Sequence, residues 1–587
     1  MKYSDLLADW LVELGYTHCF FVAGGNIMHL LESCSRRFKC IPVVHEVAAG
    51  IAAEYFTAVS ENERAFALVT AGPGLTNIVT AIAGAFLESR ELLVLGGQVK
   101  LADLARRQVR QRGIQEINGV EIVQPITVRS TLLEECIDRS TLADLVNSTT
   151  NGRRGPVFLE IPLDIQGRDV TSAGLTEKLV SNPGVPSCSD DMLADLITRL
   201  RNAKRPVLLI GGGVTRKTAE SLYDQLEKIR IPLMTTWNGV DRIPAAHPLY
   251  MGRPNTWGQR SSNIILQQAD LLVALGTRLG LQQTGFNWQE FLPGGEVVQV
   301  DCDPKELQKG HPRVKVPICE DANTVLKRVA SSNLGNYEDW VTFCGFVRKT
   351  IALAEPANHT GEGYLSPFVF AQNLSRLCAS QDVVIPCSSG SAYTVMMQTF
   401  DVKRGQRMLN NKGLAAMGYG LSGAIGAAFA AGAGRTILVE GDGGFMQNMQ
   451  ELGTVAANRL NIKIFLFSDN GYASIRMTQR NYFGGRYIGC DTETGLGIPR
   501  WEHIFAAYDI PLLELGQDFE GDIEFCRRFN ETGPMGFIVK IDPDQTYFPK
   551  ITSRITEDGS MASNPLHLMT PALDDETAAK VFRYLAR

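Results

Sequence analysis

Short runs of consecutive apolar residues, separated by longer stretches with helical periodicity, recur along the whole chain. Ten runs are long enough for buried strands: 66–69, 92–95, 157–161, 207–210, 271–275, 297–300, 383–385, 436–439, 463–467 and 537–541. Continuously apolar strands that alternate with helices are typical of parallel sheets covered on both faces. The pattern therefore predicts an α/β protein whose ligands lie at the carboxyl ends of its strands.

The runs form three groups, and turn-forming residues cluster between the groups. The stretches 166–191 and 330–367 are rich in Gly, Pro, Ser and Asn, which marks them as linkers. We therefore expect three doubly wound parallel-sheet domains, over residues 1–170, 190–330 and 365–550. The tail 551–587 is polar at first and weakly helical after residue 574.

Composition narrows the class of protein. Of the 587 residues, 44% are hydrophobic and 20% are charged, as in a globular protein, and the net charge of −6 argues against nucleic acid and anionic membranes as partners. No apolar run reaches the ~18 residues of a spanning helix, and the acidic residues near the start do not suit a signal peptide. The 12 cysteines include no Cys-x-x-Cys pair. We expect a cytoplasmic enzyme with free thiols.

Two acidic residues at strand ends in the third group predict a metal site. Asp442 follows the run 436–439 within Gly-Asp-Gly-Gly, and Asp469 follows the next run, twenty-seven residues later. Carboxylates at neighbouring strand ends can share one Mg²⁺, and the intervening glycines let backbone N–H groups approach a diphosphate. Gly-Asp-Gly alone is only a common turn, but its spacing and the two strand contexts favour a metal–diphosphate site.

A third acidic residue of interest lies in the first group. Glu46 stands where an apolar run enters a helix of small residues, so it is shielded from water and able to share a proton with a ring nitrogen. A glutamate that interacts with a helix N-terminus is the commoner explanation, and this segment alone favours it. Loops at 70–77, 96–98 and 388–391 also follow strands, and each is consistent with a plain turn.

Together these segments resemble the thiamine diphosphate enzymes of the acetolactate synthase group. The resemblance rests on His45-Glu46, residues 70–77, GLAAMGYGLSGAIG at 413–426, GDGGFMQNMQEL at 441–452 and Asp-Asn-Gly-Tyr at 469–472, all in the order found in the family. It implies a pyrimidine-binding, a central and a diphosphate-binding domain. It also implies a homodimer or homotetramer, with the cofactor between the first domain of one subunit and the third domain of its partner.

The resemblance assigns roles to individual residues. Glu46 would hydrogen-bond the aminopyrimidine N1′, and Asp442, Asp469 and the carbonyl of Gly471 would hold Mg²⁺. Other contacts with thiamine diphosphate would come from Gly72, Asn77, Ser389, Gly390, Ser391, Ala415, Met417, Gly443, Gly444 and Tyr472. Met417 would hold the cofactor in a V shape; on the sequence alone it would be assigned to the core. Decarboxylation of a 2-oxoacid and transfer of the acyl carbanion to an acceptor would follow.

The chain departs from the family on the acceptor side and at one metal ligand. The family usually has Asn where this chain has Asp469, a change that still suits Mg²⁺. By position, Thr478 replaces a tryptophan that lines the substrate entrance of acetolactate synthases, which would open the pocket. Gln115 matches the family's substrate-side glutamine, although it is also suited to capping a turn. The resemblance places Gly24, Gly25 and Ile475 in the same acceptor pocket.

These departures resemble the YerE-like carboligases, which join a two-carbon unit from pyruvate to a keto-sugar nucleotide. We therefore expect a carboligase with a large ketone or aldehyde acceptor. Three alternatives stay open: acetolactate synthase proper, a non-ligating decarboxylase or lyase, and a cofactor-binding protein without activity. FAD also stays open, because 211–213 and 276–278 match flavin-contact positions but an acidic stretch of the family is missing at 279–285. We favour no essential flavin.

Overall fold

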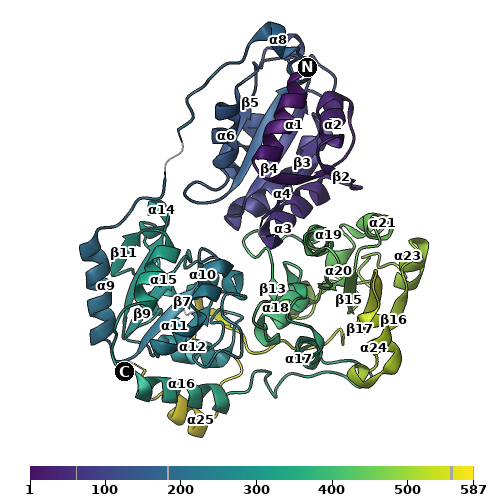
Figure 1. The fold of residues 1–587 in the computed structure, drawn as a ribbon. Coiled ribbons are helices and arrows are strands. Elements are labelled where there is room, and N and C mark those ends of the chain that lie inside the picture. Colours follow the sequence, from purple (N-terminus) through teal and green to yellow (C-terminus); the bar gives the residue numbers. More distant parts are fainter. Residues whose placement is uncertain (61, 182–183, 556–558, 586–587) are drawn as a thin grey trace. The chain divides into compact units, whose positions relative to one another are not determined.

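The computed structural model describes residues 1–60, 62–181, 184–555 and 559–585 (Figure 1). Parts of the predicted first linker and of the tail, residues 182–183, 556–558 and 586–587, lie outside the described residues. The fold is α/β with three sheets whose recorded pairings are all parallel, as the apolar pattern predicts. Each of the ten apolar runs overlaps a strand.

The first sheet has the strand order β2-β1-β3-β4-β6-β5. Its strands are β1 (Tyr16–Phe21), β2 (Lys39–Pro42), β3 (Arg64–Val69), β4 (Leu92–Gln98), β5 (Arg129–Leu132) and β6 (Pro156–Pro162). Its helices are α1 (Tyr3–Glu13), α2 (Met28–Ser35), α3 (Glu46–Val59), α4 (Pro73–Leu87), α5 (Gly119–Val123), α6 (Arg139–Asn147), α7 (Leu163–Gln166) and α8 (Val170–Ala173). Every residue of β4 and β6 is buried, which explains their unbroken apolar runs.

The central sheet has the order β11-β10-β9-β7-β8. Its strands are β7 (Pro206–Ile210), β8 (Leu233–Thr235), β9 (Leu271–Leu275), β10 (Glu296–Asp301) and β11 (Val316–Cys319). Its helices are α9 (Asp190–Asn202), α10 (Arg216–Ser221), α11 (Tyr223–Lys228), α12 (Arg260–Gln267), α13 (Leu281–Thr284), α14 (Pro304–Leu307), α15 (Ala322–Ala330) and α16 (Glu338–Thr350). Helix α16 lies inside the predicted linker 330–367. Its residues Trp340, Phe343 and Val347 pack into the central core, so this part is not a linker.

The third sheet has the order β13-β12-β14-β15-β17-β16. Its strands are β12 (Val383–Ile385), β13 (Arg407–Met408), β14 (Thr436–Gly441), β15 (Ile462–Ser468), β16 (Leu512–Glu514) and β17 (Met535–Lys540). Its helices are α17 (Pro367–Leu377), α18 (Gly390–Thr399), α19 (Tyr419–Ala431), α20 (Asp442–Phe445), α21 (Leu452–Ala457), α22 (Ala473–Tyr482), α23 (Trp501–Ala507) and α24 (Ile523–Asn530). The tail adds β18 (Ser553–Ile555), β19 (Met561–Ser563) and α25 (Asp575–Val581), where weak helicity is predicted.

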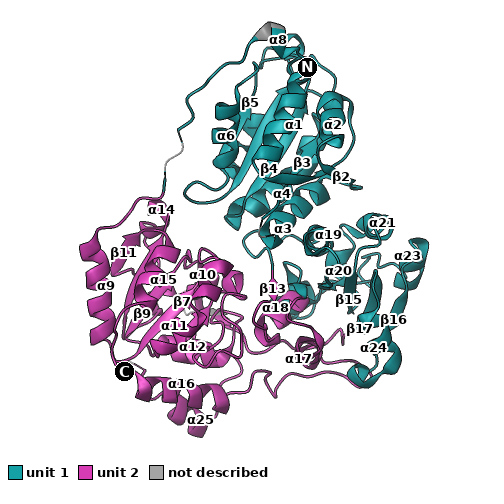
Figure 2. Cartoon of the chain, in the orientation of Figure 1, with its two compact units in different colours: residues 1–184, 382–390, 409–539 teal, residues 185–381, 391–408, 540–587 magenta. Residues whose placement is uncertain are grey.

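Contacts group the chain into two compact units, coloured separately in Figure 2. The first unit holds residues 1–184, 382–390 and 409–539, and the second holds 185–381, 391–408 and 540–587. The first unit joins the first sheet to most of the third through one hydrophobic core, in which α3 packs on α19. Among the residues that the structure describes, no helix has both the length and the apolar character needed to span a bilayer.

Small residues allow the close packing of α3 on α19. A Cβ on Gly426 would lie 2.1 Å from the carbonyl oxygen of Ala52, and a Cβ on Gly423 would lie 2.8 Å from the ring of Tyr55. Tyr419 reinforces the contact, because its hydroxyl donates to Oε2 of buried Glu54 at 2.5 Å. The run of Gly and Ala in α19 is therefore a helix-packing surface.

Candidate active site

The predicted diphosphate and metal residues come together because their strands are neighbours. β14 pairs with β12 on one side and with β15 on the other, all parallel. Their carboxyl ends therefore meet at one edge of the third sheet, which brings the loop after β12, Asp442 after β14 and Asp469 after β15 to the same place. The chain reverses its direction across the sheet between β12 and β14, the usual ligand position in doubly wound folds.

Asp442 and Asp469 form a buried pair of carboxylates. Asp442 is fully buried and accepts hydrogen bonds from the backbone N–H groups of Gly443 at 2.7 Å and Asn470 at 2.9 Å. Burial, and then the charge of Asp469, raises the pKa of Asp442; burial also raises the pKa of Asp469. Asp469 also pairs with the buried guanidinium of Arg476 at 3.0 Å. Two buried carboxylates with one guanidinium between them still leave a site suited to a cation such as the predicted Mg²⁺.

The turn that follows β15 requires glycine. Gly471 has φ +153, and a Cβ there would lie 2.1 Å from the carbonyl oxygen of Cys490. The next residue, Tyr472, donates its N–H to that same oxygen at 2.8 Å. Its ring lies against Gly443, where a Cβ would approach the ring to 2.4 Å. The glycines of both predicted metal segments are therefore set by tight packing.

The loop after β12 presents open backbone to this edge. Gly390 has φ +82, and a Cβ there would meet nothing within 4 Å. Ser389 lies half-buried just before it, while the hydroxyl of buried Ser388 donates to the carbonyl oxygen of Ala416. Ser391 begins the part of α18 that belongs to the second unit. A Cβ on Gly444 would lie 3.2 Å from Oε1 of Glu440.

The segment 413–418 leads into α19 and carries the residues predicted to face the pyrimidine. Ala415 has a left-handed backbone, with φ +56. Met417 is 39% exposed, which argues against the core position that its sequence context suggests. Asn448 holds the segment by donating to the carbonyl oxygen of Gly418 at 2.8 Å.

Glu46 is the first residue of α3 and is 8% exposed. The side-chain amide of Asn77, on α4, donates to its Oε2 at 2.9 Å, so the structure brings these two predicted site residues into contact. His45 caps the helix through Nδ1, which accepts the N–H of Val47 at 3.2 Å. A capped and oriented carboxylate at this position is suited to holding a proton at a ring nitrogen.

Glu451 ties the strand end before Glu46 to the third domain. Its carboxylate accepts the backbone N–H groups of Val44 at 3.1 Å and His45 at 2.9 Å, and the hydroxyl of Thr454 at 2.7 Å. Burial raises the pKa of Glu451. This residue lies within the quoted family segment 441–452, but sequence reasoning gave it no role, because the bond joins residues about 400 positions apart.

Two further loops of the first domain meet beside Gly72. A Cβ on Gly72, which has φ +66, would lie 2.4 Å from the carbonyl oxygen of Gln115, and Gln115 itself is exposed with φ +63. A Cβ on Gly24 would lie 2.4 Å from Cβ of Thr70. Gly25 begins the short helix that follows, with open space around it. These predicted residues share the edge at the ends of β1 and β3.

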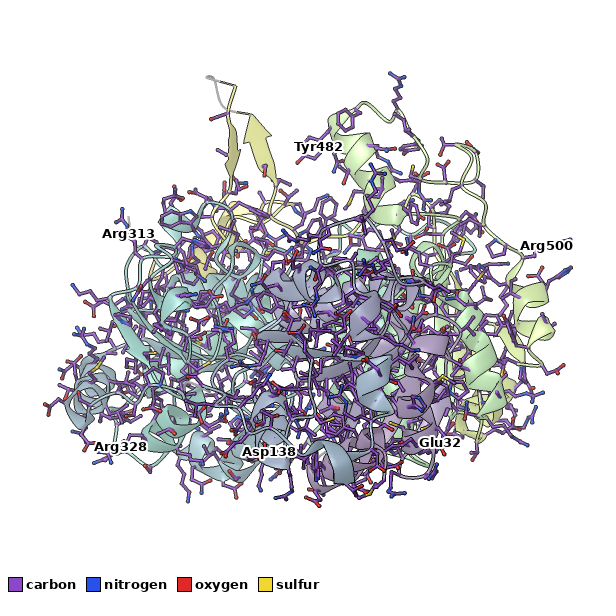
Figure 3. The ribbon with its side chains drawn as sticks, turned by 90° about the horizontal axis from the view of Figure 1, so that it is seen from above. Glu32, Asp138, Arg313, Arg328, Tyr482 and Arg500 are labelled. Atoms are coloured by element: carbon purple, nitrogen blue, oxygen red, sulfur yellow. The ribbon has the colours of Figure 1, made fainter. Side chains whose placement is uncertain are left out.

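Two of the four predicted acceptor residues, Ile475 and Thr478, lie on α22, whereas Gly24 and Gly25 follow β1. Ile475 is 47% exposed, and the side chain of Thr478, whose hydroxyl donates to the carbonyl oxygen of Ser474 at 2.9 Å, is exposed as well. Tyr482, at the end of the helix, projects outward and is 54% exposed (Figure 3).

These features fit Mg²⁺ and a diphosphate. Two buried carboxylates point to a cation, and open glycine backbone points to an anion. In the described residues no group of three or more His, Cys, Asp or Glu side chains could hold a metal, so further ligands would have to be backbone, water or cofactor oxygens. A cavity of about 410 Å³ beside Lys463 lies at the opposite edge, where β15 begins, and none of the predicted site residues lines it.

Comparisons with known proteins identify the family of each domain. The chain matches the N-terminal TPP binding domain of thiamine pyrophosphate enzymes over residues 1–122, their central domain over 193–329 and their C-terminal TPP binding domain over 388–535. These matches cover more than half of the chain, one for each sheet. The chain belongs to the thiamine pyrophosphate enzymes.

Relatives that match most of the chain narrow the family. The chain is 27% identical to the acetolactate synthase isozyme 1 large subunit of Escherichia coli, over 93% of this chain and 95% of that protein. It is 29% identical to a probable acetolactate synthase large subunit of Methanocaldococcus jannaschii, over 83% of each. This thiamine pyrophosphate enzyme is thus a distant relative of acetolactate synthase large subunits.

The central domain brings its two glycine segments together. At the ends of β7 and β9, Gly213 donates its N–H to the carbonyl oxygen of Gly276 at 2.9 Å. A Cβ on Gly211 would lie 2.3 Å from that same oxygen. The two segments therefore pack on each other, which is a structural reason for glycine at both places whether or not a flavin is bound.

Proposed function

We propose that this protein is a Mg²⁺- and thiamine diphosphate-dependent carboligase. It decarboxylates a 2-oxoacid, preferably pyruvate, and joins the remaining acyl unit to a large ketone or aldehyde such as a keto-sugar nucleotide. The observation that carries the proposal is the pairing of two elements: a carboxylate held by Asn77 at the start of α3, and a two-carboxylate cation site at the strand ends of the third domain.

The residues of the third domain would bind the metal and the diphosphate, and those of the first domain would bind the pyrimidine. Asp442, Asp469 and the carbonyl of Gly471 hold Mg²⁺, while Gly443 and the loop after β12 leave room for a diphosphate. Glu46 holds a proton at the pyrimidine ring, and Asn77 fixes the orientation of its carboxylate. Thiamine diphosphate, when bound, supplies the electron sink that decarboxylation needs. Burial of the carboxylates excludes water, which strengthens these electrostatic contacts.

The acceptor preference rests on α22. A short threonine stands at position 478, with its hydroxyl committed to the helix backbone, where the family has a tryptophan. Thr478 is exposed and short, so its side chain leaves the approach wide, with the exposed side chain of Ile475 on the same helix. An open entrance suits an acceptor larger than a second pyruvate.

We further propose a homodimer or homotetramer in which Glu46 of one subunit serves the third domain of its partner. The exposure of Met417 and Ile475, both large and apolar, is what a surface completed by a second subunit would show.

The test is product formation from pyruvate with and without added acceptors. Release of CO₂ and a new C–C bond only when a keto-sugar nucleotide or another large carbonyl is present supports the proposal. Glu46→Gln keeps the size and removes the acid, so it should abolish turnover and retain cofactor binding. Turnover by Glu46→Gln at the wild-type rate would refute the assignment of Glu46.

Acetolactate synthase activity is a second candidate, favoured by the names of the relatives. Pyruvate alone would then give acetolactate at a rate that added acceptors do not raise. CO₂ release with acetaldehyde and no ligated product would instead indicate a simple decarboxylase. Cofactor retention with no turnover of any 2-oxoacid would indicate a binding protein without activity.

A further inference from the structure

Arg476 is a buried arginine next to the predicted metal site. It is the fourth residue of α22, the helix that follows Asp469 and the turn at Gly471, and it is 3% exposed. A guanidinium keeps its charge at all relevant pH values, and a buried one needs partners for its five N–H groups. The partners of Arg476 therefore show what it does.

One guanidinium nitrogen of Arg476 makes two hydrogen bonds to Asp469, in the segment that supplies two predicted metal ligands. Nη2 donates to the carbonyl oxygen of Asp469 at 2.8 Å and to its Oδ1 at 3.0 Å. Nη1 lies 3.0 Å from the position that a Cβ on Gly471 would occupy. The backbone and the carboxylate of Asp469 are thus fixed by one side chain, which also lies against the residue whose carbonyl would complete the metal site.

The other donors of Arg476 have no partner in the described part of the chain. Nε and Nη1 are both buried and make no hydrogen bond. The nearby carboxylate of Asp491 makes no hydrogen bond to them: its Oδ1 accepts from the N–H and the hydroxyl of Thr494 at 2.9 and 2.7 Å, and Arg476 acts on Asp491 only through its charge, which helps to lower the pKa of that carboxyl. Buried donors without partners are costly, and an anion at this edge would satisfy them.

We propose that Arg476 is a positioning residue of the metal–diphosphate site, which orients Asp469 and the turn to Gly471 and offers its remaining N–H groups to the bound anion. The inference rests on the proposed function, since it assumes Mg²⁺ and thiamine diphosphate at this edge. It predicts that Arg476 governs retention of both, and that it takes no part in the chemistry once the site is full.

The experiment measures binding directly, by calorimetric titration of the full chain with thiamine diphosphate at fixed Mg²⁺, and with Mg²⁺ at fixed thiamine diphosphate. Arg476→Met should weaken both by about 10- to 100-fold, the usual cost of losing a group that orients a metal ligand. Arg476→Lys keeps the charge but lacks the planar set of guanidinium N–H groups, so its affinities for both ligands should lie between those of wild type and Arg476→Met. At saturating cofactors, kcat of Arg476→Lys should stay within about threefold of wild type.

Two further variants make the test specific. Arg480→Met makes the same substitution one turn further along α22. Arg480 is partly exposed and donates to the hydroxyl of Tyr487 at 3.1 Å. This variant should bind thiamine diphosphate and Mg²⁺ like wild type. If Arg476→Met does not fold because Asp469 is left unpaired, Asp469→Asn combined with Arg476→Met removes that charge and should still bind weakly.

The outcomes separate the inference from the proposed function. Wild-type affinities in Arg476→Met, equal losses in Arg480→Met, or a loss of kcat with unchanged affinities would each overturn the role of Arg476 while leaving the enzyme class intact. Failure of the wild-type protein to bind thiamine diphosphate with Mg²⁺ would overturn the proposed function, and this inference with it.

Discussion

The contact between Asn77 and Glu46 offers a direct test of how the catalytic carboxylate is oriented. The side-chain amide of Asn77 donates to Oε2 of Glu46 at 2.9 Å, and Glu46 is 8% exposed. Asn77→Ala removes this donor and leaves the rest of α4 unchanged. The carboxylate then loses one fixed direction, so the geometry of proton sharing with the cofactor should deteriorate.

The size of the effect follows from the kind of bond and its burial. Hydrogen bonds to charged groups contribute about 1.5–3 kcal/mol when buried. Because Asn77 is exposed, we take about 1–2 kcal/mol, which corresponds to a loss of about 5- to 30-fold in kcat/KM.

The assay is CO₂ release from pyruvate at saturating Mg²⁺ and thiamine diphosphate, together with the Kd of the cofactor. Thr76→Ala is the matched control, because Thr76 is an exposed neighbour whose hydroxyl donates only to the carbonyl oxygen of Pro73 at 3.2 Å. Wild-type kcat/KM in Asn77→Ala, or an equal loss in Thr76→Ala, would refute the reasoning.

The remaining predictions address the metal site and the buried acids. Asp469→Asn should keep Mg²⁺ binding within about tenfold of wild type, measured by calorimetry, because an amide oxygen can still ligate the ion and accept from the guanidinium. The rise in Tm caused by Mg²⁺ with thiamine diphosphate should grow from pH 5 to pH 8. Burial raises the pKa values of Asp442 and Asp469, the charge of Asp469 raises that of Asp442 further, and protons therefore compete with the metal at low pH; a rise in Tm that does not depend on pH would contradict this. Burial raises the pKa of Glu160 to about 8, so its favourable contribution is complete below its unfolded pKa and is lost as pH rises through 8; Glu160→Gln should therefore raise Tm relative to wild type at pH 8–9 more than at pH 5. Tyr419→Phe leaves Oε2 of Glu54 without its donor and should lower the free energy of unfolding by about 1–3 kcal/mol, measured by denaturant titration, with an unchanged midpoint as the contrary result.

The sequence by itself determined the interior strands of the three sheets except β1 (YTHCFF), which lies between β2 and β3, and it indicated the local chemistry of the site. Apolar runs such as 157–161 and 271–275 are buried on both faces, so their identity follows from composition alone. The apolar pattern did not predict short or polar strands such as β5 (RSTL) and β11 (VPIC), because edge strands carry no continuous apolar run. Helix α16 was assigned to a linker for a related reason, since the turn-forming residues that flank it dominate the segment 330–367.

Tertiary structure alone decided which of the candidate residues meet. Asp442 and Asp469 were recognisable because each directly follows a strand, and the sheet order then made those strands neighbours. Arg476 and Glu451 gave no such sign, because a buried ion pair and a bond across about 400 residues depend on the burial of both partners. Local pattern specifies elements through short-range energetics, whereas the cost of burying a charge is offset only by a partner that folding brings close.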